Sequence, residues 1–316
     1  MRLGVIDVGS NTVHLLIVDA HHGGHPWPAH SEKVALRLAE RIGPDGALTR
    51  DGADALVETV RAFRESAARH GTGELLAFAT SAVRDATDAT AVLTRVRKET
   101  GVPLEVLSGA DEARATFLAV RRWCGWSAGR LLTMDIGGGS LELAAGFDEV
   151  PTVALSLPLG AGRLTREHLD VTPQTAEPVP AQTVDALRAY VQEQLDPVLG
   201  QLAADGWDRA VATSKTFRML ARLAGAAPAK AGLWTPRSLT HRGVRQVLGF
   251  IRHIAPAKLG ELEGVGTSRA HQLLAGALVA ETLLRRLEID SVDICPWALR
   301  EGLILRRLDQ LADNGA

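Results

Sequence analysis

One short pattern occurs twice in this chain and limits what it can fold into. Each copy is an apolar run that ends in Asp-x-Gly, a turn of small residues and a second apolar run. The copies comprise 2–19 and 131–146. Apolar runs on both sides of a small turn are typical of a buried β-hairpin. The aspartates are Asp7 and Asp135, which are 135 − 7 = 128 residues apart. The repeat predicts an internal duplication.

Further apolar patterns follow each hairpin in a similar order. The first half predicts strands at 2–8, 13–19, 33–38, 75–79 and 103–107 and helices over 53–67, from about 81 and from Ser108. The second half predicts strands at 131–136, 141–146, 152–157, 209–212 and 291–294 and helices over 184–202, from about 216, over 267–287 and over 297–308. We therefore expect two similar α/β domains, 1–125 and 126–316. The last helix is free to pack back on the first domain, and ligands are expected in a cleft between the two.

The two turns have the composition of anion-binding loops, because backbone N–H groups of small residues allow close approach. Their residues are Gly9, Ser10 and Asn11 in the first turn and Gly137, Gly138, Gly139 and Ser140 in the second. A bare carboxylate beside phosphate is repulsive unless a cation bridges them, so Asp7 and Asp135 indicate Mg²⁺. Two ordinary hairpins are the alternative, which a matched pair at duplicated positions disfavours.

The amino-acid sequences of these segments resemble those of a known family. IDVGSNTVHLLI and DIGGGSLEL are similar to the two phosphate-binding loops of the actin, Hsp70 and sugar-kinase superfamily, and within it to the exopolyphosphatase and guanosine pentaphosphate phosphatase (Ppx/GppA) family. Further segments agree in order: FATSAVRDA, VLSGADEARATFLAV, LPLGAGRLT, GVGTSRAHQLLAGALV and CPWALREGLIL. The resemblance implies two ribonuclease-H-like domains. It also implies the short form of the family, because the chain contains no His-Asp dipeptide of the added C-terminal helical domain.

Two glutamates are candidates for catalysis and metal binding. Ser108 with Asp111 three residues on is a capping-box pattern, which places Glu112 in the first turn of a helix. The resemblance implies that Glu112 is the base that takes a proton from the attacking water. A partner of the helix dipole is the alternative. Glu142 should face the same side as Ser140, and the resemblance implies a metal- or water-handling role instead of a surface charge.

Several basic residues are candidates for phosphate binding. The resemblance implies that Arg84 contacts phosphate, for which its planar fork is suited. Arg163 and Arg114 are weaker candidates, with a solvated or ion-paired arginine as the alternative. Lys33 and Arg37 alternate on one face of a predicted strand and could extend a basic track.

Residues 211–220 (VATSKTFRML) depart from the nucleotide-binding relatives, which carry a glycine-rich turn against the nucleoside there. Ser214 can cap the following helix. Lys215 places a cation at a helix N-terminus, which is unfavourable unless an anion is bound nearby. We interpret Ser214 and Lys215 as phosphate contacts in place of a nucleoside pocket, which favours a plain phosphate chain over a nucleotide.

Composition excludes several other classes. The 35 basic and 37 acidic side chains nearly cancel, and no basic helix or nucleic-acid fingerprint is present, so no nucleic-acid partner is expected. The longest apolar run, 273–280, is too short to cross a bilayer, so no membrane partner is expected. Two cysteines without metal or redox spacing, Cys124 and Cys295, fit a reducing cytoplasm. HHGGH at 21–25 is interpreted as a solvated loop. Trp123, Trp126 and Trp297 are interpreted as residues that pack at the domain junction instead of stacking on bases.

The sequence thus favours an exopolyphosphatase that uses Mg²⁺, with Mn²⁺ as a possible substitute, to release terminal phosphate from inorganic polyphosphate. A guanosine pentaphosphate 5′-phosphohydrolase, a kinase of the same superfamily and a non-catalytic regulator that binds polyphosphate or alarmone in the stringent response are the alternatives. Guanosine tetra- or pentaphosphate is a possible ligand. The oligomeric state stays open, and a homodimer is one of the states that the sequence allows.

Overall fold

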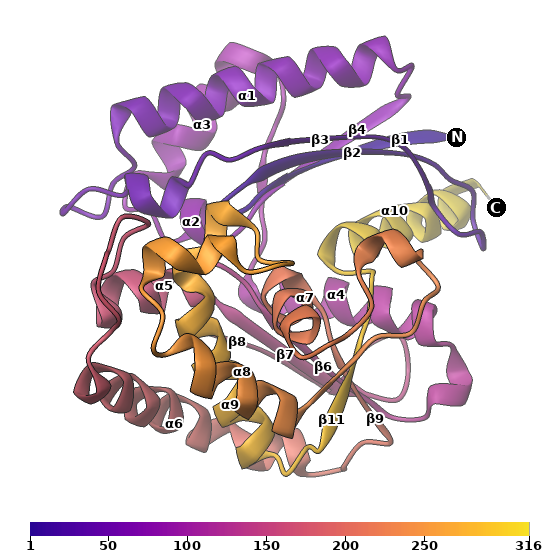
Figure 1. Ribbon diagram of the computed structural model, residues 1–316. Helices are drawn as coiled ribbons and strands as arrows, with labels where there is room; N and C mark the ends of the chain where they lie inside the picture. The colour runs from indigo at the N-terminus through magenta and orange to yellow at the C-terminus, as the bar shows by residue number, and fades with distance from the viewer. Residues whose placement is uncertain (316) are drawn as a thin grey trace. The chain divides into compact units, whose positions relative to one another are not determined.

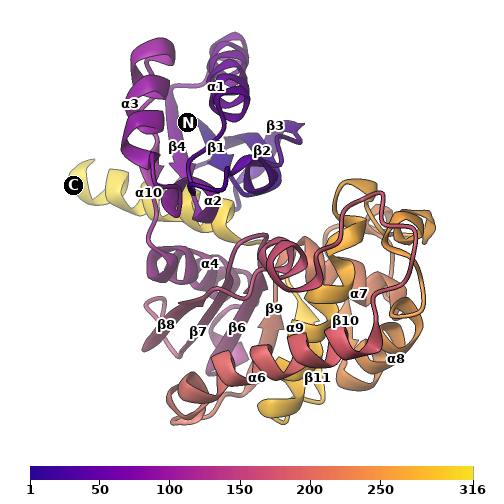
Figure 2. The same ribbon diagram turned by 90° about the vertical axis from the view of Figure 1, so that its left-hand side faces the viewer.

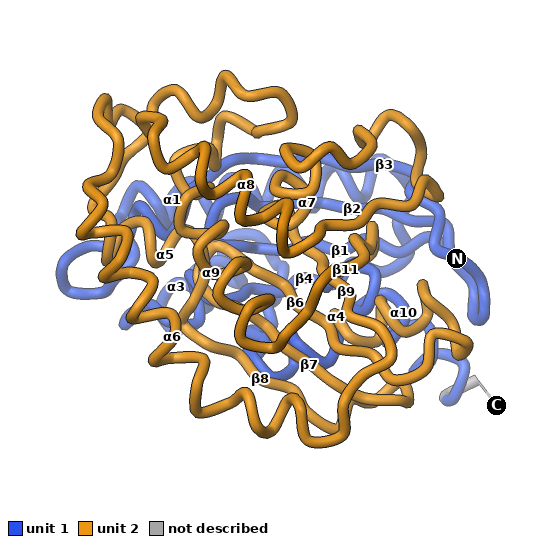
Figure 3. The backbone as a smooth tube through the Cα atoms, turned by 60° about the horizontal axis from the view of Figure 1, so that its bottom comes forward, with its two compact units in different colours: residues 1–115, 299–316 blue, residues 116–298 orange. Residues whose placement is uncertain are grey.

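The protein forms two compact units, seen in a computed structural model that describes residues 1–315. The first unit consists of residues 1–115 and the last helix, and the second unit consists of residues 116–298 (Figure 3). The boundary falls inside one continuous helix, α4 (Gly109–Cys124). The domain bounds expected from the sequence, 1–125 and 126–316, stay a prediction.

The first unit contains a five-stranded sheet. In order across the sheet its strands are β3 (Trp27–Val34), β2 (Val13–Asp19), β1 (Arg2–Val8), β4 (Glu74–Ala79) and β5 (Glu105–Val106). Neighbours among β1, β2 and β3 are antiparallel, whereas β4 runs parallel to β1 and β5 parallel to β4. Its other elements are η1 (Leu38–Arg41), α1 (Arg50–Arg69), α2 (Ser81–Arg84), α3 (Ala89–Thr100), the start of α4, and α10 (Leu299–Gly315).

Both faces of this sheet are covered, because the side chains of β1 alternate between two apolar clusters. Ile6 and Val8 belong to the cluster beneath α1 and α3. Leu3 and Val5 belong to a second cluster, to which α10 contributes Leu303 and Ile304. Figure 2 shows α1 and α3 on one side of the sheet and α10 on the other.

A single glycine allows α10 to pack closely on the start of α4. A Cβ atom at Gly302 would lie 1.8 Å from the carbonyl oxygen of Ala115, so any larger residue would push the two helices apart. The last helix therefore depends on a close backbone contact as well as on its apolar face.

The second unit contains a six-stranded sheet. In order across the sheet its strands are β10 (Ser238–Thr240), β11 (Ser291–Ile294), β9 (Arg209–Ala212), β6 (Leu131–Ile136), β7 (Leu141–Gly146) and β8 (Val153–Leu157). Its other elements are the end of α4, η2 (Trp126–Ala128), α5 (Ala161–Leu164), the π-helix η3 (Thr165–Leu169), α6 (Ala181–Ala203), α7 (Ser214–Leu223), η4 (Ala229–Ala231), α8 (His241–Ile251), η5 (Pro256–Glu261), η6 (Thr267–Gln272) and α9 (Leu273–Arg286). Helix α9 is buried over most of its length and fills the core with α5, α6, α7 and α8 around it.

The two sheets repeat one plan. The order β3-β2-β1-β4-β5 of the first sheet corresponds to β8-β7-β6-β9-β11 of the second, and in both the last three strands are parallel. This topology confirms the expected fold class, α/β with two ribonuclease-H-like halves from an internal duplication. The predicted cleft between the halves stays a prediction. None of the described helices has the length and hydropathy needed to cross a membrane.

Some element predictions were wrong. The third strand spans 27–34 rather than 33–38, because the chain leaves the sheet and Arg37 takes a left-handed conformation with φ of 49° before η1. The helix expected from about 81 ends after four residues at Arg84. The helix expected over 267–287 begins as a 3₁₀ helix, η6, and only α9 continues as an α-helix.

Candidate active site

The loop at 137–140, between β6 and β7, is held from its carbonyl side. The carbonyl oxygens of Gly137, Gly138 and Gly139 accept hydrogen bonds at 2.9–3.0 Å. The backbone N–H of Ala161 donates to Gly137. In Arg163 the backbone N–H donates to Gly138 and the side-chain Nε donates to Gly139. The segment that carries α5 therefore fixes the orientation of every peptide plane in the glycine run.

A glycine makes this contact possible. A Cβ atom at Gly160 would lie 2.3 Å from the carbonyl carbon of Gly139 and 2.3 Å from the nitrogen of Ser140. Real Cβ atoms do not approach backbone so closely, so only glycine lets the chain pass against the loop.

The opposite side of the loop presents N–H donors. Within residues 1–315, the N–H groups of Gly138, Gly139 and Ser140 donate to no protein acceptor. Successive N–H groups of this kind form a concave anion site. The geometry has the form expected of a phosphate-binding loop.

The loop between β1 and β2 is built in the same way. Gly9 N–H donates to the carbonyl of Thr12 at 3.1 Å, as Gly137 N–H does to Ser140 at 2.9 Å in the second copy. The carbonyls of the next two residues accept hydrogen bonds from the segment 37–39.

These carbonyls belong to Ser10 and Asn11, both of which are buried. The hydroxyl of Ser10 lies 2.9 Å from the hydroxyl of Ser81, at the start of α2. The first loop is thus tied to the helix that carries Arg84.

Two carboxylates lie side by side in the second unit. Asp135 on β6 is directly opposite Glu142 on β7, and Glu142 is directly opposite Ser156 on β8. Directly opposite residues of antiparallel strands project from the same face. The Ser156 hydroxyl donates to Glu142 Oε1 at 2.9 Å, and the hydroxyl of Thr213, just after β9, donates to Asp135 Oδ2.

These four side chains, Ser156, Glu142, Asp135 and Thr213, form a row across four strands that we call the carboxylate row. Like charges directly opposite each other are destabilising, and Glu142 is buried. The described residues contain no group of three His, Cys, Asp or Glu that could hold a metal ion. Mg²⁺ commonly binds one or two carboxylates together with substrate phosphates, so the pair fits a magnesium ion.

Asp7 stands in β1 where Asp135 stands in β6, but its neighbour differs. The residue opposite Asp7 is His14, not a carboxylate. The His14 ring Nε2 lies 2.7 Å from the hydroxyl of Ser31 on β3. The duplication therefore supplies a carboxylate pair in the second unit and a single carboxylate in the first.

The start of α4 is capped as predicted. The Ser108 hydroxyl accepts a hydrogen bond from the N–H of Asp111 at 3.1 Å and donates to its carboxylate at 2.6 Å. This hydrogen bond holds the pKa of Asp111 below its usual range. The cap places Glu112 on the next position of the first turn, where its side chain is buried.

Glu112 is paired with Arg84. Arg84 Nη1 donates to Glu112 Oε1 and also to the carbonyl of Leu107 at 3.1 Å. Burial acts to lower the pKa of Arg84, and the carboxylates of Glu112 and Asp85 together more than offset it, so the pKa is raised. The proposed base and a proposed phosphate contact thus form one ion pair.

The weaker basic candidates have structural contacts. Arg114 is exposed and pairs with Asp111 at 3.0 Å, which satisfies it without phosphate. Arg163 binds the glycine loop through its carbonyl side. Lys33 lies on β3 opposite His14, and the face that it was predicted to share with Arg37 does not exist, because Arg37 lies outside the strand.

Ser214 and Lys215 begin α7. Ser214 has φ of 64°, an unusual value for serine, and its hydroxyl accepts the N–H of Phe217 at 3.4 Å. The N-cap position of α7 is Thr213, whose side chain makes no cap hydrogen bond, so Ser214 contacts the first turn without occupying the predicted cap position. Lys215 is exposed, and its Nζ lies against Gly266, 2.6 Å from where a Cβ would stand there.

Sequence reasoning missed three hydroxyl residues, namely Ser81, Ser156 and Thr213. A signal for two of them was present, because Ala-Thr-Ser occurs at 79–81 and again at 212–214, each time at the end of a strand next to a central strand. Nothing in the sequence near Ser156 marks it, since its role comes from strand pairing alone.

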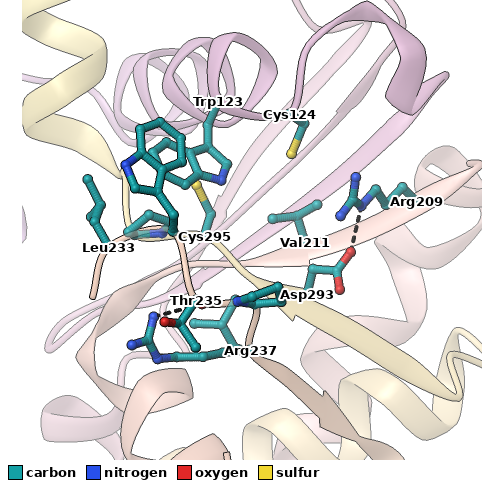
Figure 4. Close-up of a pocket in the computed structure, with 13 residues that line it drawn as sticks. Trp123, Cys124, Arg209, Val211, Leu233, Thr235, Arg237, Asp293 and Cys295 are labelled. Carbon is teal, nitrogen blue, oxygen red and sulfur yellow. Dashed lines mark hydrogen bonds and ion pairs between the residues drawn. The ribbon is translucent and has the colours of Figure 1, made fainter. Parts of the chain in front are cut away.

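A separate pocket of about 280 Å³ lies in the second unit (Figure 4). Trp123 stacks on Trp234 with ring centres 4.6 Å apart and contacts Trp297, whereas Trp126 is exposed. Cys124 and Cys295 also line this pocket, and burial raises the pKa of the Cys124 thiol. None of the site residues predicted from the sequence lines it.

Known proteins are similar to this chain in sequence and in fold. Residues 17–311 match the Ppx/GppA phosphatase family. The protein named Exopolyphosphatase 1 of Mycobacterium tuberculosis is 58% identical over 317 residues, covering 100% of this chain and 91% of the relative.

Two solved structures are similar. The crystal structure of an exopolyphosphatase from Cytophaga hutchinsonii has a TM-score of 0.87 at 24% identity and covers 98% of both chains. The Ppx/GppA enzyme of Aquifex aeolicus has a TM-score of 0.80 at 24% identity, covering 97% of this chain and 99% of the other. Since the family match spans most of the sequence and a relative is 58% identical across all of it, this chain belongs to the Ppx/GppA phosphatase family.

Proposed function

We propose that this protein is an exopolyphosphatase that hydrolyses terminal orthophosphate from inorganic polyphosphate and requires Mg²⁺, with Mn²⁺ as a possible substitute. The observation that carries the proposal is the glycine loop at 137–140, which begins two residues after Asp135. The N–H groups of Gly138, Gly139 and Ser140 in this loop have no protein acceptor among the described residues. The 58% identity to a protein named Exopolyphosphatase 1 supports the same substrate.

Each residue has a role in this proposal. The N–H groups of both loops bind phosphate oxygens, and Asp135 and Glu142 hold the Mg²⁺, with Asp7 as a further ligand. Bound Mg²⁺ would neutralise charge on the phosphates. Glu112 takes the proton of the attacking water, for which its ionised form is needed, and pairing with arginine favours that form.

Under this proposal Arg84 binds Glu112 and also binds a phosphate oxygen of the substrate. In the structure it binds Glu112, the carboxylate of Asp85 and the Leu107 carbonyl. A guanidinium offers five N–H donors in a rigid fork, so it can keep one contact and bind a phosphate oxygen with the others. Phosphoryl transfer depends mainly on such positioning and charge neutralisation.

The preference for a plain phosphate chain rests on the start of α7. Ser214 and Lys215 occupy the position at which nucleotide-binding relatives have a glycine-rich turn. Lys215 is an exposed cation there, which suits a phosphate group better than an uncharged base.

The test is phosphate release at saturating Mg²⁺ from long polyphosphate, short polyphosphate and guanosine pentaphosphate in parallel. We expect release from polyphosphate, and loss of that release in Glu112→Gln. Release mainly from guanosine pentaphosphate would instead assign the nucleotide phosphohydrolase activity. Binding of all three without release would assign a non-catalytic regulator.

A further inference from the structure

We infer that Thr213 and Ser156 are positioning residues that fix the two carboxylates of the carboxylate row for one divalent cation. The inference rests on the proposed function, because that function gives Asp135 and Glu142 their metal. Neither hydroxyl was predicted to contact phosphate or metal, although Thr213 directly precedes Ser214.

The two hydroxyls flank the carboxylates symmetrically. Thr213 donates to Asp135 from the β9 side, and Ser156 donates to Glu142 from the β8 side at 2.9 Å. Both donors therefore lie at the outer ends of the row, and the carboxylates are neighbours in its middle.

The hydroxyl at each end of the carboxylate row fixes the orientation of the carboxylate beside it. The terminal torsion of Asp and Glu is broad, so an unsupported carboxylate rotates readily. A hydrogen bond to one oxygen fixes the plane of the group and so the direction of its second oxygen. Supporting hydrogen bonds of this kind tune metal ligands, and their loss typically weakens metal affinity about 10- to 100-fold.

Strand register explains why only the second unit has this arrangement. Ala212 is paired with Met134, so Thr213 comes to lie beside Asp135, and its N–H binds the Met134 carbonyl at 2.9 Å. The Thr213 hydroxyl lies 3.4 Å from the same carbonyl in addition to its contact with Asp135. In the first unit the corresponding threonine, Thr80, has nearly the same backbone conformation.

Its register differs, however. Ala79 is paired with Val8, one residue beyond Asp7, so Thr80 lies next to the glycine turn and its hydroxyl points to the Val8 carbonyl at 3.4 Å. The repeated Ala-Thr-Ser segment therefore supports a carboxylate only where that carboxylate also has a second carboxylate beside it. Thr213 is fully buried, so its hydroxyl is committed to contacts within the protein.

The experiment measures Mn²⁺ binding without polyphosphate, from the loss of the free-ion signal in electron paramagnetic resonance. The variants are Thr213→Val, which keeps the shape and removes the hydroxyl, Thr213→Ser, which restores it, and Ser156→Ala. The matched control is Thr133→Val, since Thr133 is also buried, lies two residues before Asp135 on the same face and donates only to the Ala144 carbonyl at 3.2 Å.

We expect Thr213→Val and Ser156→Ala each to weaken Mn²⁺ binding about 10- to 100-fold, and Thr213→Ser and Thr133→Val to bind like the wild type. At saturating Mg²⁺ the first two variants should regain most of their kcat on polyphosphate. If Thr213→Val fails to fold, Ser156→Ala tests the same idea at the half-buried end of the row.

Three results would overturn the inference: wild-type affinity in both hydroxyl variants, an equal loss in Thr133→Val, or a wild-type protein that binds no Mn²⁺. The binding measurement does not need hydrolysis. A wild-type protein that binds Mn²⁺ but leaves polyphosphate intact would therefore refute the proposed function and not the positioning role.

Discussion

Arg84 and Glu112, which are separated by 28 residues in the sequence, form an ion pair whose carboxylate is buried. The pair joins the end of the short helix α2 to the first turn of α4. It makes the proposed base and a proposed phosphate ligand parts of one hydrogen-bonded unit. Because their proposed roles differ, substitution of Glu112 should act on kcat and substitution of Arg84 on KM.

Replacing Glu112 by Gln should remove catalysis while leaving substrate binding intact. The amide keeps the shape of the side chain but cannot accept the proton of the attacking water. We expect kcat on polyphosphate to fall about 10²- to 10⁴-fold with little change in KM. Steady-state phosphate release checks this. Turnover near that of the wild type in a folded variant would mean that another group is the base.

Replacing Arg84 by Lys should chiefly weaken substrate binding. An ammonium group cannot reproduce the forked contact, and loss of a charged hydrogen bond corresponds to about a 10- to 100-fold rise in KM. Arg114→Lys is the control, since Arg114 is exposed and pairs only with Asp111 among the described acidic groups. Equal KM changes in the two variants would argue against a phosphate contact at Arg84.

Replacing Gly160 by Ala should disturb the phosphate loop directly. The new Cβ would lie 2.3 Å from the Gly139–Ser140 peptide, and overpacking of this kind typically costs about 1–3 kcal/mol of stability. We expect a lower melting temperature together with a large loss of activity. Gly200→Ala is the control, because Gly200 is exposed within α6 with no atom within 4 Å of its added Cβ. That change should stabilise the protein by about 0.5–1 kcal/mol.

Removing divalent ions should abolish activity. The neighbouring carboxylates of Asp135 and Glu142 repel each other and the phosphate chain unless a cation is present. We expect no phosphate release in excess chelator, full recovery when Mg²⁺ is restored, and a higher melting temperature with Mg²⁺ than without it. Undiminished turnover in the chelator would refute the role of the metal.

Replacing Ser108 by Ala should weaken the start of α4 in a pH-dependent way. Loss of the cap should cost about 1 kcal/mol at neutral pH. The Ser108 hydroxyl lowers the pKa of Asp111 in the folded state, so this interaction stabilises the fold above about pH 4 and is lost as the pH falls through the folded value. Below that pH, the free energies of unfolding of wild type and variant, measured by urea denaturation, should therefore differ less. A constant difference would show that Asp111 does not contribute.

Local pattern was enough to predict most of the central strands. The runs 131–136 and 141–146 were predicted with their actual ends, because an apolar run, an aspartate and a glycine turn specify a buried hairpin without reference to the rest of the chain. The cap at Ser108 followed from two residue types three positions apart. The fold class followed because this local pattern occurs twice.

Segments in which apolar residues show no regular spacing were harder to predict from the sequence. The third strand was placed too late, because its side chains over 27–34 are largely exposed and show no clear alternation. Helix α8 was not predicted at all. The candidate site residues in the loops and the carboxylates can be identified from the sequence. Their roles stay predictions, which the variants above test.

The sequence by itself thus determined the duplicated hairpins, the two glycine turns and the candidate carboxylates, since each depends on residues close together along the chain. Only the tertiary structure decided that Thr213 and Ser156 support these carboxylates, that Arg84 meets Glu112, and that Gly160 passes against the loop. For Thr213 and Ser156 the physical reason is register: a shift of one residue between paired strands would turn their side chains to the opposite face, and packing across the whole sheet sets that register. Arg84, Glu112 and Gly160 lie outside the strands, so their contacts depend on how helices and loops pack within each unit.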